Sequence, residues 1–364
     1  MTVHVRILGT GLIGASLGIA LSRSGFRVSL EDPSPTAARL ARDLGAGEVA
    51  GDGSTGNPGD PDLVVVAAPP DVAADVVVAS LRRWPTAVVT DVASVKGSVA
   101  DAVRAGGGDL SRYVGSHPMA GRERSGAGAA RGDLFDGRAW VVVPTEESRL
   151  DAVDLVRQAA TAVGSAVSVM AAGEHDAAVA VVSHVPQVAA SLVASRLRDV
   201  SEPAVALAGQ GLRDVTRIAA SDPRLWTQIL AGNAAAVRDV LTALRADLDE
   251  VIGALDQLSD GDSRGALEVV NRTVGQGNVG VARIPGKHGA APTAYETVVV
   301  VVPDTPGALG RLLTDMGEAG VNLEDLHLEH GLGQPFGLAE VAVVPGALGQ
   351  LLAALADRGW RVHD

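Results

Sequence analysis

The sequence predicts an α/β doubly wound sheet, then an all-α domain, and then a small α+β domain. Three observations support this prediction. Short apolar strands alternate with helices in the first part of the chain, long Ala/Leu/Val-periodic helices fill the middle, and strands return near the C-terminus. A chain of 364 residues exceeds one ordinary core, so separate domains are expected. The expected units are residues 1–172, residues 173–274, a linker at 275–294, and residues 295–364.

The first domain shows apolar runs of strand length separated by helical segments. The run LVVVAA at residues 63–68 is continuously apolar, as expected for a parallel strand that is covered on both faces. Alternation of such strands with helices predicts a doubly wound parallel sheet. Strands are expected at residues 3–8, 28–30, 63–68, 87–90 and 140–143, with helices at 15–24 and 37–44.

Strand signals stop near residue 173, and three helical stretches predict the all-α domain. Residues 275–292 are rich in Gly and Pro, which favours a linker or an ordered arm. The last part has the order strand, helix, strand, strand, helix, and this βαββα order suits a small regulatory fold. The helical stretches are residues 175–198, 203–221 and 223–257, and the C-terminal elements are expected at 297–302, 308–319, 322–329, 337–343 and 347–358.

Charge and cysteine content exclude several classes of protein. The net charge of −13 argues against a nucleic-acid partner, because no basic stripe is present to neutralise phosphates. The chain has no cysteine, which excludes disulfides, thiolate zinc sites and cysteine nucleophiles. No metal site is expected.

One segment has to be compared with a membrane span. Residues 177–195 contain no Asp, Glu, Lys or Arg and are long enough to cross a bilayer. The segment is rich in Ala and Ser, and His184, Pro186 and Gln187 interrupt it, so a helix buried in a soluble protein or at a subunit interface is favoured. No signal peptide is visible in residues 1–20. We therefore expect a cytoplasmic protein without a membrane partner.

The glycine-rich run GTGLIG, in which Leu12 and Ile13 separate the last two glycines, follows the first strand and opens a helix. Gly9 permits a tight turn, Gly11 lets the backbone approach a pyrophosphate, and Gly14 lets helix and strand pack closely. The helix N-terminus then offers amide donors to the phosphates. The run therefore predicts a Rossmann-type dinucleotide site.

Asp32 strengthens this interpretation, because it ends the second expected strand at the distance that the dinucleotide fingerprint requires. An acidic residue there accepts the adenosine ribose hydroxyls and repels a 2′-phosphate. Glu31 adds to that repulsion, and no Arg immediately follows Asp32. We therefore expect NAD rather than NADP as the cofactor.

Two polar motifs follow later strands, at the edge where open parallel sheets bind ligands. TDVASVK, residues 90–96, contains Ser94, which either contacts substrate or caps the next helix. SHPMAG, residues 116–121, places His117 in an expected Pro-containing turn after a strand. Imidazole suits proton transfer at neutral pH, so His117 is the candidate base, against the alternative of a structural histidine.

Further candidates lie in the loop after SHPMAG and in the helical domain. Glu123 and Arg122 either line the same pocket or form a solvated loop, which we favour for Arg122. His184, taken alone, is better explained as a satisfied core histidine. In GLRDVTRIA, Arg217 lies one helical turn after Arg213 and three residues after Asp214, so it suits either carboxylate binding or a surface ion pair. The apolar neighbours favour burial, and hence a site.

Taken in order, these motifs resemble one family, the prephenate/arogenate dehydrogenases of tyrosine biosynthesis, over essentially the whole chain. The C-terminal part resembles an ACT domain, a common amino-acid-sensing module that some members carry. The motifs are GTGLIGAS, the Asp32 strand end, TDVASVK, GSHPMAGRERSG, the HDxxVAxVSHxPQ stretch at residues 175–187, GLRDVTRIAASDPRLW at 211–226, and VPDTPGALG…AGVNLEDL at 302–326.

The resemblance implies oxidative decarboxylation of prephenate to 4-hydroxyphenylpyruvate, with a hydride passing to NAD and aromatisation driving the reaction. His117 would hydrogen-bond the ring hydroxyl as general base, and Ser94 would hold His117 or that hydroxyl. His184 would contact substrate from the helical domain. Arg217 would bind a substrate carboxylate. Residues expected to form a polar gate near it are Glu123 and Asp214.

The resemblance also implies assembly and regulation. The helical domain would form a homodimer, which agrees with its uncharged helix. Within the ACT-like part, Asp304 and Asn322 would hold an amino acid at a dimer interface. Because tyrosine is the pathway product, tyrosine is the expected effector.

Two alternatives remain beside prephenate oxidation. Arogenate is an alternative substrate that would give tyrosine directly, because Glu123 suits pairing with its ammonium group, and Arg122 stands where the family often has Thr. A non-catalytic regulator that senses NAD and an amino acid would explain the nucleotide fold and the tail. It leaves unexplained the joint presence of four residues, namely Ser94, His117, His184 and Arg217. A third hypothesis is a different NAD dehydrogenase with an ACT tail, of the 3-phosphoglycerate type. It is disfavoured, because that family lacks SHPMAG and an all-helical middle domain.

Overall fold

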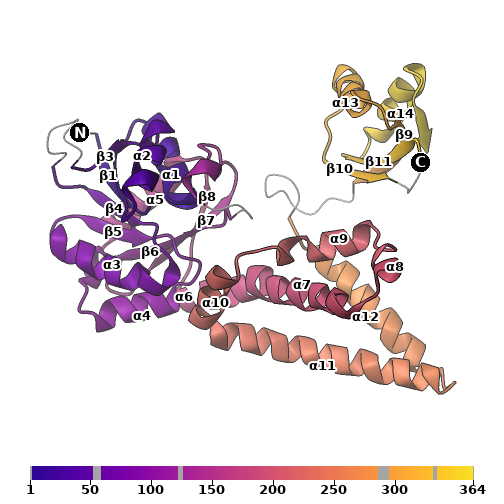
Figure 1. The fold of residues 1–364 in the computed structure, drawn as a ribbon, viewed down its shortest axis with the longest axis horizontal. Helices are drawn as coiled ribbons and strands as arrows, with labels where there is room; N and C mark the ends of the chain where they lie inside the picture. Colours follow the sequence, from indigo (N-terminus) through magenta and orange to yellow (C-terminus); the bar gives the residue numbers. More distant parts are fainter. Residues whose placement is uncertain (1, 52–58, 122–125, 286–294, 331–333, 364) are drawn as a thin grey trace. The chain divides into compact units, whose positions relative to one another are not determined.

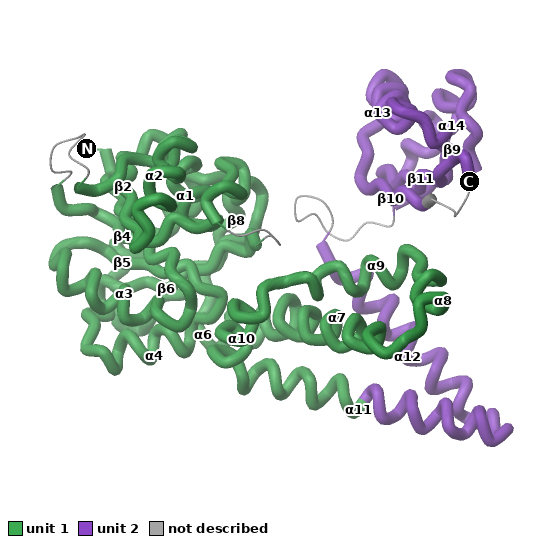
Figure 2. The backbone as a smooth tube through the Cα atoms, in the orientation of Figure 1, with its two compact units in different colours: residues 1–246 green, residues 247–364 purple. Residues whose placement is uncertain are grey.

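The computed structural model describes residues 2–51, 59–121, 126–285, 295–330 and 334–363. The chain forms two compact units, residues 1–246 and residues 247–364, each considered by itself (Figure 2). The first unit contains the nucleotide-binding sheet and most of the helical domain. The second contains the end of the long helix α11, the helix α12 and the C-terminal sheet.

The first unit is built around a parallel sheet with the strand order β3-β2-β1-β4-β5 (Figure 1). The strand order reverses at β1, so the crevice for a ligand lies beyond the carboxyl ends of β1 and β4. This arrangement confirms the predicted doubly wound sheet. The strands are β1 His4–Leu8, β2 Arg27–Glu31, β3 Glu48–Val49, β4 Leu63–Val66 and β5 Val88–Asp91.

Helices cover both faces of this sheet, because its strands carry apolar side chains on both sides. Val5 and Ile7 pack in a core with α1 and α5, whereas Val64 and Val66 pack in a second core with α3 and α4. Both cores consist mainly of Ala, Val and Leu. The helices are α1 Leu12–Arg23, α2 Pro35–Asp43, α3 Pro70–Arg83, α4 Gly97–Ala105 and α5 Leu150–Ala162.

A three-stranded sheet, β6-β7-β8, continues this domain. The strand β6, Val114–Pro118, runs antiparallel to β7, Ala139–Pro144, and β7 runs parallel to β8, Ala166–Val169. An isolated parallel bridge joins Val89 to Tyr113, between β5 and the start of β6. The sequence did not predict β6, because VGSHP lacks a strand-like apolar pattern.

The helical part of the first unit begins with α6, a π turn and α7, which form one continuous helical segment. Pro186 has no N–H to donate to an i−4 carbonyl, and the π turn at Ala180–His184 ends two residues before it. Further helices follow and confirm an all-α domain, and α9 packs against α7. The helices are α6 Ala172–Val179, α7 Val185–Arg196, α8 Glu202–Val205, α9 Gln210–Thr216, α10 Pro223–Gly232 and α11 Ala234–Ser259.

Length and composition alone would let the segment Ala172–Asp199 cross a membrane, with a mean hydropathy of 1.7. About a third of its most apolar window is buried within the protein (33%). Core helices of soluble proteins meet the same criterion, so this segment is weak evidence for a membrane span.

In the second unit, α12 runs from Ala266 to Val281. The expected linker was therefore placed too early, because residues 275–281 are helical. Glycines at 275, 277 and 280 suggested a break, but a helix tolerates isolated glycines at a cost of about 1 kcal/mol each. Residues 286–294 of the expected linker lie outside the described residues.

The C-terminal sheet has the order β10-β11-β9-β12, with every neighbouring pair antiparallel. Alternate residues of β9, namely Val298, Val300 and Val302, pack against Leu312 and Leu351 of the two helices. The predicted βαββα order is present, and a short final strand extends it. The elements are β9 Glu296–Pro303, α13 Ala308–Glu318, β10 Asp325–His330, β11 Phe336–Val343, α14 Leu348–Asp357 and β12 Arg361–His363.

Candidate active site

The glycine turn between β1 and α1 has the shape that a dinucleotide needs. A Cβ on Gly14 would lie 1.9 Å from the carbonyl oxygen of Gly9, and a Cβ on Gly9, whose φ is +99°, would lie 2.4 Å from that of Ala67. Both positions therefore exclude a side chain. A Cβ on Gly11 would meet nothing within 4 Å, so the space above it is open. The open space at the N-terminus of α1 fits a pyrophosphate.

Asp32 follows β2 and points back to this turn. Its Oδ2 accepts hydrogen bonds from the Thr10 amide at 2.7 Å and the Thr10 hydroxyl at 2.9 Å, and its Oδ1 accepts one from the Ser34 amide at 2.8 Å. Glu31, by contrast, pairs with Arg83 at 2.8 Å. Because the charge of Glu31 is paired, Asp32 is the better candidate for contact with the adenosine ribose.

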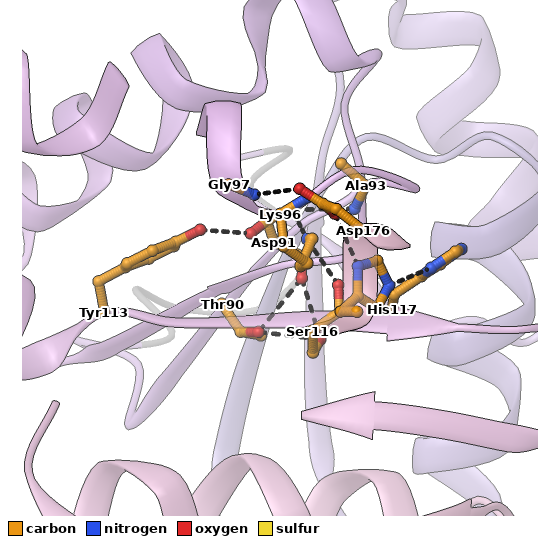
Figure 3. A network of polar contacts seen from close by, with 10 residues as sticks. Thr90, Asp91, Ala93, Lys96, Gly97, Tyr113, Ser116, His117 and Asp176 are labelled. Carbon is orange, nitrogen blue, oxygen red and sulfur yellow. Dashed lines mark hydrogen bonds and ion pairs between the residues drawn. The ribbon is translucent and has the colours of Figure 1, made fainter. Parts of the chain in front are cut away.

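A buried charged network lies just beyond β5 (Figure 3). Lys96 forms an ion pair with Asp91 and donates a hydrogen bond to the Ser116 carbonyl oxygen at 2.7 Å. The Tyr113 hydroxyl donates to Asp91 Oδ2 at 2.7 Å. Burial lowers the pKa of Lys96, although Asp91 opposes that shift, and burial raises the pKa of Tyr113 well above its ordinary value. The network joins β5 to β6 directly beside His117.

Sequence reasoning missed these residues as a site. The available signal was a pair of opposite charges, Asp91 and Lys96, within the short TDVASVK motif that directly follows an apolar strand. Ser94 of the same motif is half-buried between them along the chain. It is not the helix cap, because α4 begins at Gly97 and its N-cap residue is Lys96. The capping alternative for Ser94 is therefore wrong.

His117 lies in the strand β6 rather than in a turn, which corrects the sequence prediction. Only 7% of the residue is exposed, and its Nδ1 lies 2.9 Å from Nε2 of His175. Burial lowers the pKa of His117 well below its ordinary value, and the charges of Lys96, His175 and His184 lower it further. A neutral imidazole at pH 7 can accept a proton, as a general base must.

His175 is completely buried and links His117 to Asp176. Its Nδ1 lies 2.8 Å from Asp176 Oδ1. The carboxylate of Asp176 also accepts the amide hydrogens of Lys96 at 2.9 Å and Gly97 at 2.8 Å, where α4 begins. Burial opposes ionisation, but hydrogen bonds from His175, Gly97 and Lys96 leave the pKa of Asp176 below its ordinary value.

His184 lies in the π turn with 1% of its surface exposed. The Asn233 side-chain nitrogen lies 3.1 Å from His184 Nδ1 and donates to the Asp176 carbonyl oxygen at 2.7 Å. The ring of Trp226 meets the His184 ring edge-on, with centroids 6.0 Å apart. Burial lowers the pKa of His184. Asp176 links the two imidazoles, because it contacts His175 beside His117 and accepts from Asn233 beside His184.

The arginine motif is less buried than expected. Arg213, Asp214 and Arg217 are all exposed in the chain, so the prediction of burial is wrong. The helix α9 ends at Thr216, and Asp214 accepts a hydrogen bond from Gln210 at 2.8 Å. Apolar neighbours suggested burial, but Leu207 and Val215 are themselves exposed. Glu123 and Arg122 lie outside the described residues.

A Rossmann-type sheet with an open glycine turn and a buried neutral histidine beside an all-helical domain defines an NAD-dependent dehydrogenase. The family model for the prephenate dehydrogenase nucleotide-binding domain matches residues 17–169, and the one for the prephenate dehydrogenase dimerization domain matches residues 171–266. The chain belongs to the prephenate dehydrogenase family and is an NAD-dependent oxidoreductase.

Individual relatives agree with this membership. The chain is 37% identical to the probable prephenate dehydrogenase NovF of Streptomyces niveus, over 97% of this chain and 98% of that protein. It is 31% identical to cyclohexadienyl dehydrogenase of Zymomonas mobilis, over 72% of this chain and 92% of that protein. The structure resembles that of A. aeolicus prephenate dehydrogenase in complex with hydroxyphenyl propionate and NAD+, with a TM-score of 0.65 and 28% identity, covering 76% of this chain and 98% of that one.

Proposed function

We propose that the protein converts prephenate to 4-hydroxyphenylpyruvate and carbon dioxide. The observation that supports this most directly is His117, a buried imidazole with a lowered pKa near the binding edge of a dinucleotide-binding sheet. NAD, when bound, accepts the hydride from the hydroxyl-bearing ring carbon, while the bond to carbon dioxide supplies the electron pair that completes the aromatic ring. No net proton is released, because the hydroxyl hydrogen stays with the product.

His117 polarises the substrate hydroxyl in this proposal. As positive charge develops at the ring carbon, the hydroxyl hydrogen shifts toward the imidazole and then returns to the phenol oxygen. Ser94 orients either the hydroxyl or His117, and His184 contacts the substrate from the π turn. We place Arg217 on a substrate carboxylate, because a guanidinium fork matches that group. Glu123 and Asp214 are assigned to a polar gate near Arg217.

Cofactor contacts are assigned to the glycine turn and the end of β2. Gly9 and Gly14 shape the turn, the backbone from Gly11 through Leu12 and Ile13 faces the pyrophosphate, and Asp32 accepts the ribose hydroxyls. Asp32 also selects NAD over NADP, because its carboxylate repels a 2′-phosphate.

Turnover of candidate substrates tests the proposal. NADH formation should be fastest with prephenate, slower with arogenate, and absent with 3-phosphoglycerate. Faster turnover of arogenate would reassign the substrate, and no turnover with any of them would reject the catalytic proposal. Arg217→Ala should raise the substrate KM strongly and leave the KM for NAD nearly unchanged. Equal damage to both KM values would make Arg217 structural.

We also propose that the helical domain forms a homodimer. Its described surface exposes many large apolar side chains, and exposed apolar patches often mark sites of protein association. A groove of about 490 Å³ on the first unit is lined by α7, α10 and α11, with Arg238 and Arg245 among its residues. Sedimentation should give a dimer at micromolar concentration, and a monomer would contradict the proposal. Exposed apolar residues of the first unit include Val181, Val182, Leu192 and Leu207.

For the C-terminal sheet domain we propose an ACT-like regulatory role with tyrosine as effector. Asp304 directly follows β9, Asn322 lies in the loop between α13 and β10, and both are exposed. Tyrosine should inhibit the full chain and lose this effect when residues 295–364 are deleted. Inhibition that persists unchanged would place tyrosine at the active site.

Cytoplasmic localisation is also part of the proposed function, since the family reaction is biosynthetic.

A further inference from the structure

We propose that Asp176 fixes opposite tautomers of the two active-site histidines, leaving Nε2 of His117 bare and Nε2 of His184 protonated. The carboxylate acts on His117 through His175, and the backbone carbonyl acts on His184 through Asn233. His175 and Asn233 are thereby positioning residues. The proposal deepens the proposed function, because it assigns the proton-accepting atom and the hydrogen-donating atom of the same site.

With His117 and His175 both uncharged, the hydrogen-bond chain to His117 has one consistent arrangement of hydrogens. The ionised Asp176 carboxylate is an acceptor only, so the hydrogen in its 2.8 Å contact with His175 belongs to Nδ1 of His175. A neutral imidazole carries one ring hydrogen, so Nε2 of His175 is then an acceptor. The 2.9 Å contact therefore takes its hydrogen from Nδ1 of His117, which leaves Nε2 of His117 with a lone pair.

Two backbone amides stabilise the ionised form of Asp176 that this arrangement requires. The amides of Lys96 and Gly97 donate to the carboxylate at the N-terminus of α4, where the helix dipole also favours negative charge. The carboxylate is thus held in place from a different domain of the first unit than the one that supplies His175.

The hydrogen bonds that link the Asp176 carbonyl oxygen to His184 through Asn233 fix the opposite tautomer. The Asn233 side-chain amide donates one hydrogen to the Asp176 carbonyl oxygen at 2.7 Å and has a second directed at His184 Nδ1, 3.1 Å away. A flipped amide would set its oxygen against that carbonyl, two acceptors facing each other. His184 Nδ1 is therefore an acceptor, and the ring hydrogen lies on Nε2. His184 can donate to a substrate oxygen while His117 accepts from another.

Nitrogen-15 NMR of the ring nitrogens tests the assignment on the intact protein, with and without saturating NAD. Signals are assigned by their loss in His117→Asn and His184→Asn. We expect hydrogen on Nδ1 of His117 and on Nε2 of His184. Hydrogen on Nε2 of His117 in the wild-type protein would overturn the proposal, and this measurement needs no variant that might misfold.

A matched pair of variants tests His175. His175→Gln keeps an amide oxygen that can accept from His117 and an amide hydrogen that can reach Asp176, whereas His175→Leu removes both. We expect His175→Leu to lower kcat about 100-fold or more, because the wrong tautomer of a catalytic histidine is costly, and to move hydrogen onto Nε2 of His117. His175→Gln should restore most of kcat and the original tautomer. The KM for NAD should stay nearly constant in both.

Asn233→Asp tests the second chain. A carboxylate cannot donate, so His184 should move its hydrogen to Nδ1 and substrate KM should rise while the KM for NAD is kept. Unchanged tautomers in both His175→Leu and Asn233→Asp would overturn the proposal. The outcomes of these tests can be distinguished from the outcomes that test the proposed function. Expected tautomers with no prephenate turnover would reject only the substrate, and prephenate turnover with reversed tautomers would reject only the present inference.

Discussion

Lys96 donates its ammonium hydrogen to the carbonyl oxygen of Ser116, 2.7 Å away, and so is fixed to the residue that precedes His117. The same ammonium pairs with Asp91, and the two side chains are 1% and 0% exposed. The ion pair of Lys96 and Asp91 therefore holds β5 to β6, the strand that contains His117. Changes to this pair should affect both the stability of the protein and the pKa of His117. Several experiments can separate these contributions.

Lys96→Met should destabilise the protein by about 3–5 kcal/mol, because it leaves the buried Asp91 carboxylate without a cation. The Lys96 charge also lowers the pKa of His117, so its removal should raise that pKa. Denaturant unfolding measures the first effect, and a shift of the acid limb of kcat/KM to higher pH measures the second. Stability within 1 kcal/mol of wild type would show that the pair is not held as described.

His117→Ala should reduce turnover about 100- to 10,000-fold, the usual cost of losing a general base. NAD binding should remain nearly intact, because the histidine lies outside the glycine turn. Steady-state kinetics and a fluorescence titration with NADH measure the two effects. Turnover within threefold of wild type would exclude His117 as the base.

Acidification should destabilise the protein below about pH 6.5. Burial lowers the pKa of His4, His117 and His184 below the value of 6.5 that holds in the unfolded chain. Between that value and the lower folded pKa values the unfolded state binds more protons, so stability rises with pH. Tm should fall as pH decreases from 7 to 5. The decrease should be smaller in His117→Asn, and an equal decrease would assign it to other groups.

Gly11→Ala and Gly14→Ala form a matched pair in the glycine turn. A Cβ at Gly14 would overlap the Gly9 carbonyl at 1.9 Å, so that variant should unfold at lower temperature. A Cβ at Gly11 meets nothing within 4 Å of the protein, so Tm should hold while the Kd for NAD rises. Thermal melts and NAD titrations distinguish the two. Tight NAD binding by a stable Gly11→Ala protein would contradict the assigned pyrophosphate position.

Asp32→Ala should weaken NAD binding and improve NADP binding, because the carboxylate no longer repels a 2′-phosphate. The carboxylate also accepts two hydrogen bonds from Thr10, so some loss of order in the turn should accompany the change. The ratio of kcat/KM for the two cofactors is the measurement. A wild-type preference for NADP would refute the role assigned to Asp32.

The sequence predicted those parts of the fold that periodicity encodes. Continuous apolar runs such as LVVV in β4 identify parallel strands, and helix periodicity identified the all-α domain. The strand β6 escaped notice because Gly115, Ser116 and His117 are small or polar although all three are buried. This strand forms by pairing with β7, and the hydrophobic pattern of its own residues does not reveal that pairing.

The candidate site was only partly predictable for a related reason. His117 stood out because imidazole chemistry suits proton transfer. The partners that determine its state come from segments far apart in the chain, such as Lys96 and His175. In its local sequence, each of these partners looks like an ordinary polar residue. The exposure of Arg213 and Arg217 shows the converse, since apolar neighbours in sequence do not ensure burial.

The contact of Asp176 with the amides of Lys96 and Gly97 attaches the first helix of the all-α domain to the first turn of α4 in the nucleotide-binding domain. The two amide hydrogens can exchange with solvent only when this attachment opens. Their hydrogen–deuterium exchange rates therefore report how often the two halves of the active site separate. A substitution far from the site that loosens this attachment would reduce activity by releasing the orientation of His175, with every reacting group still in place.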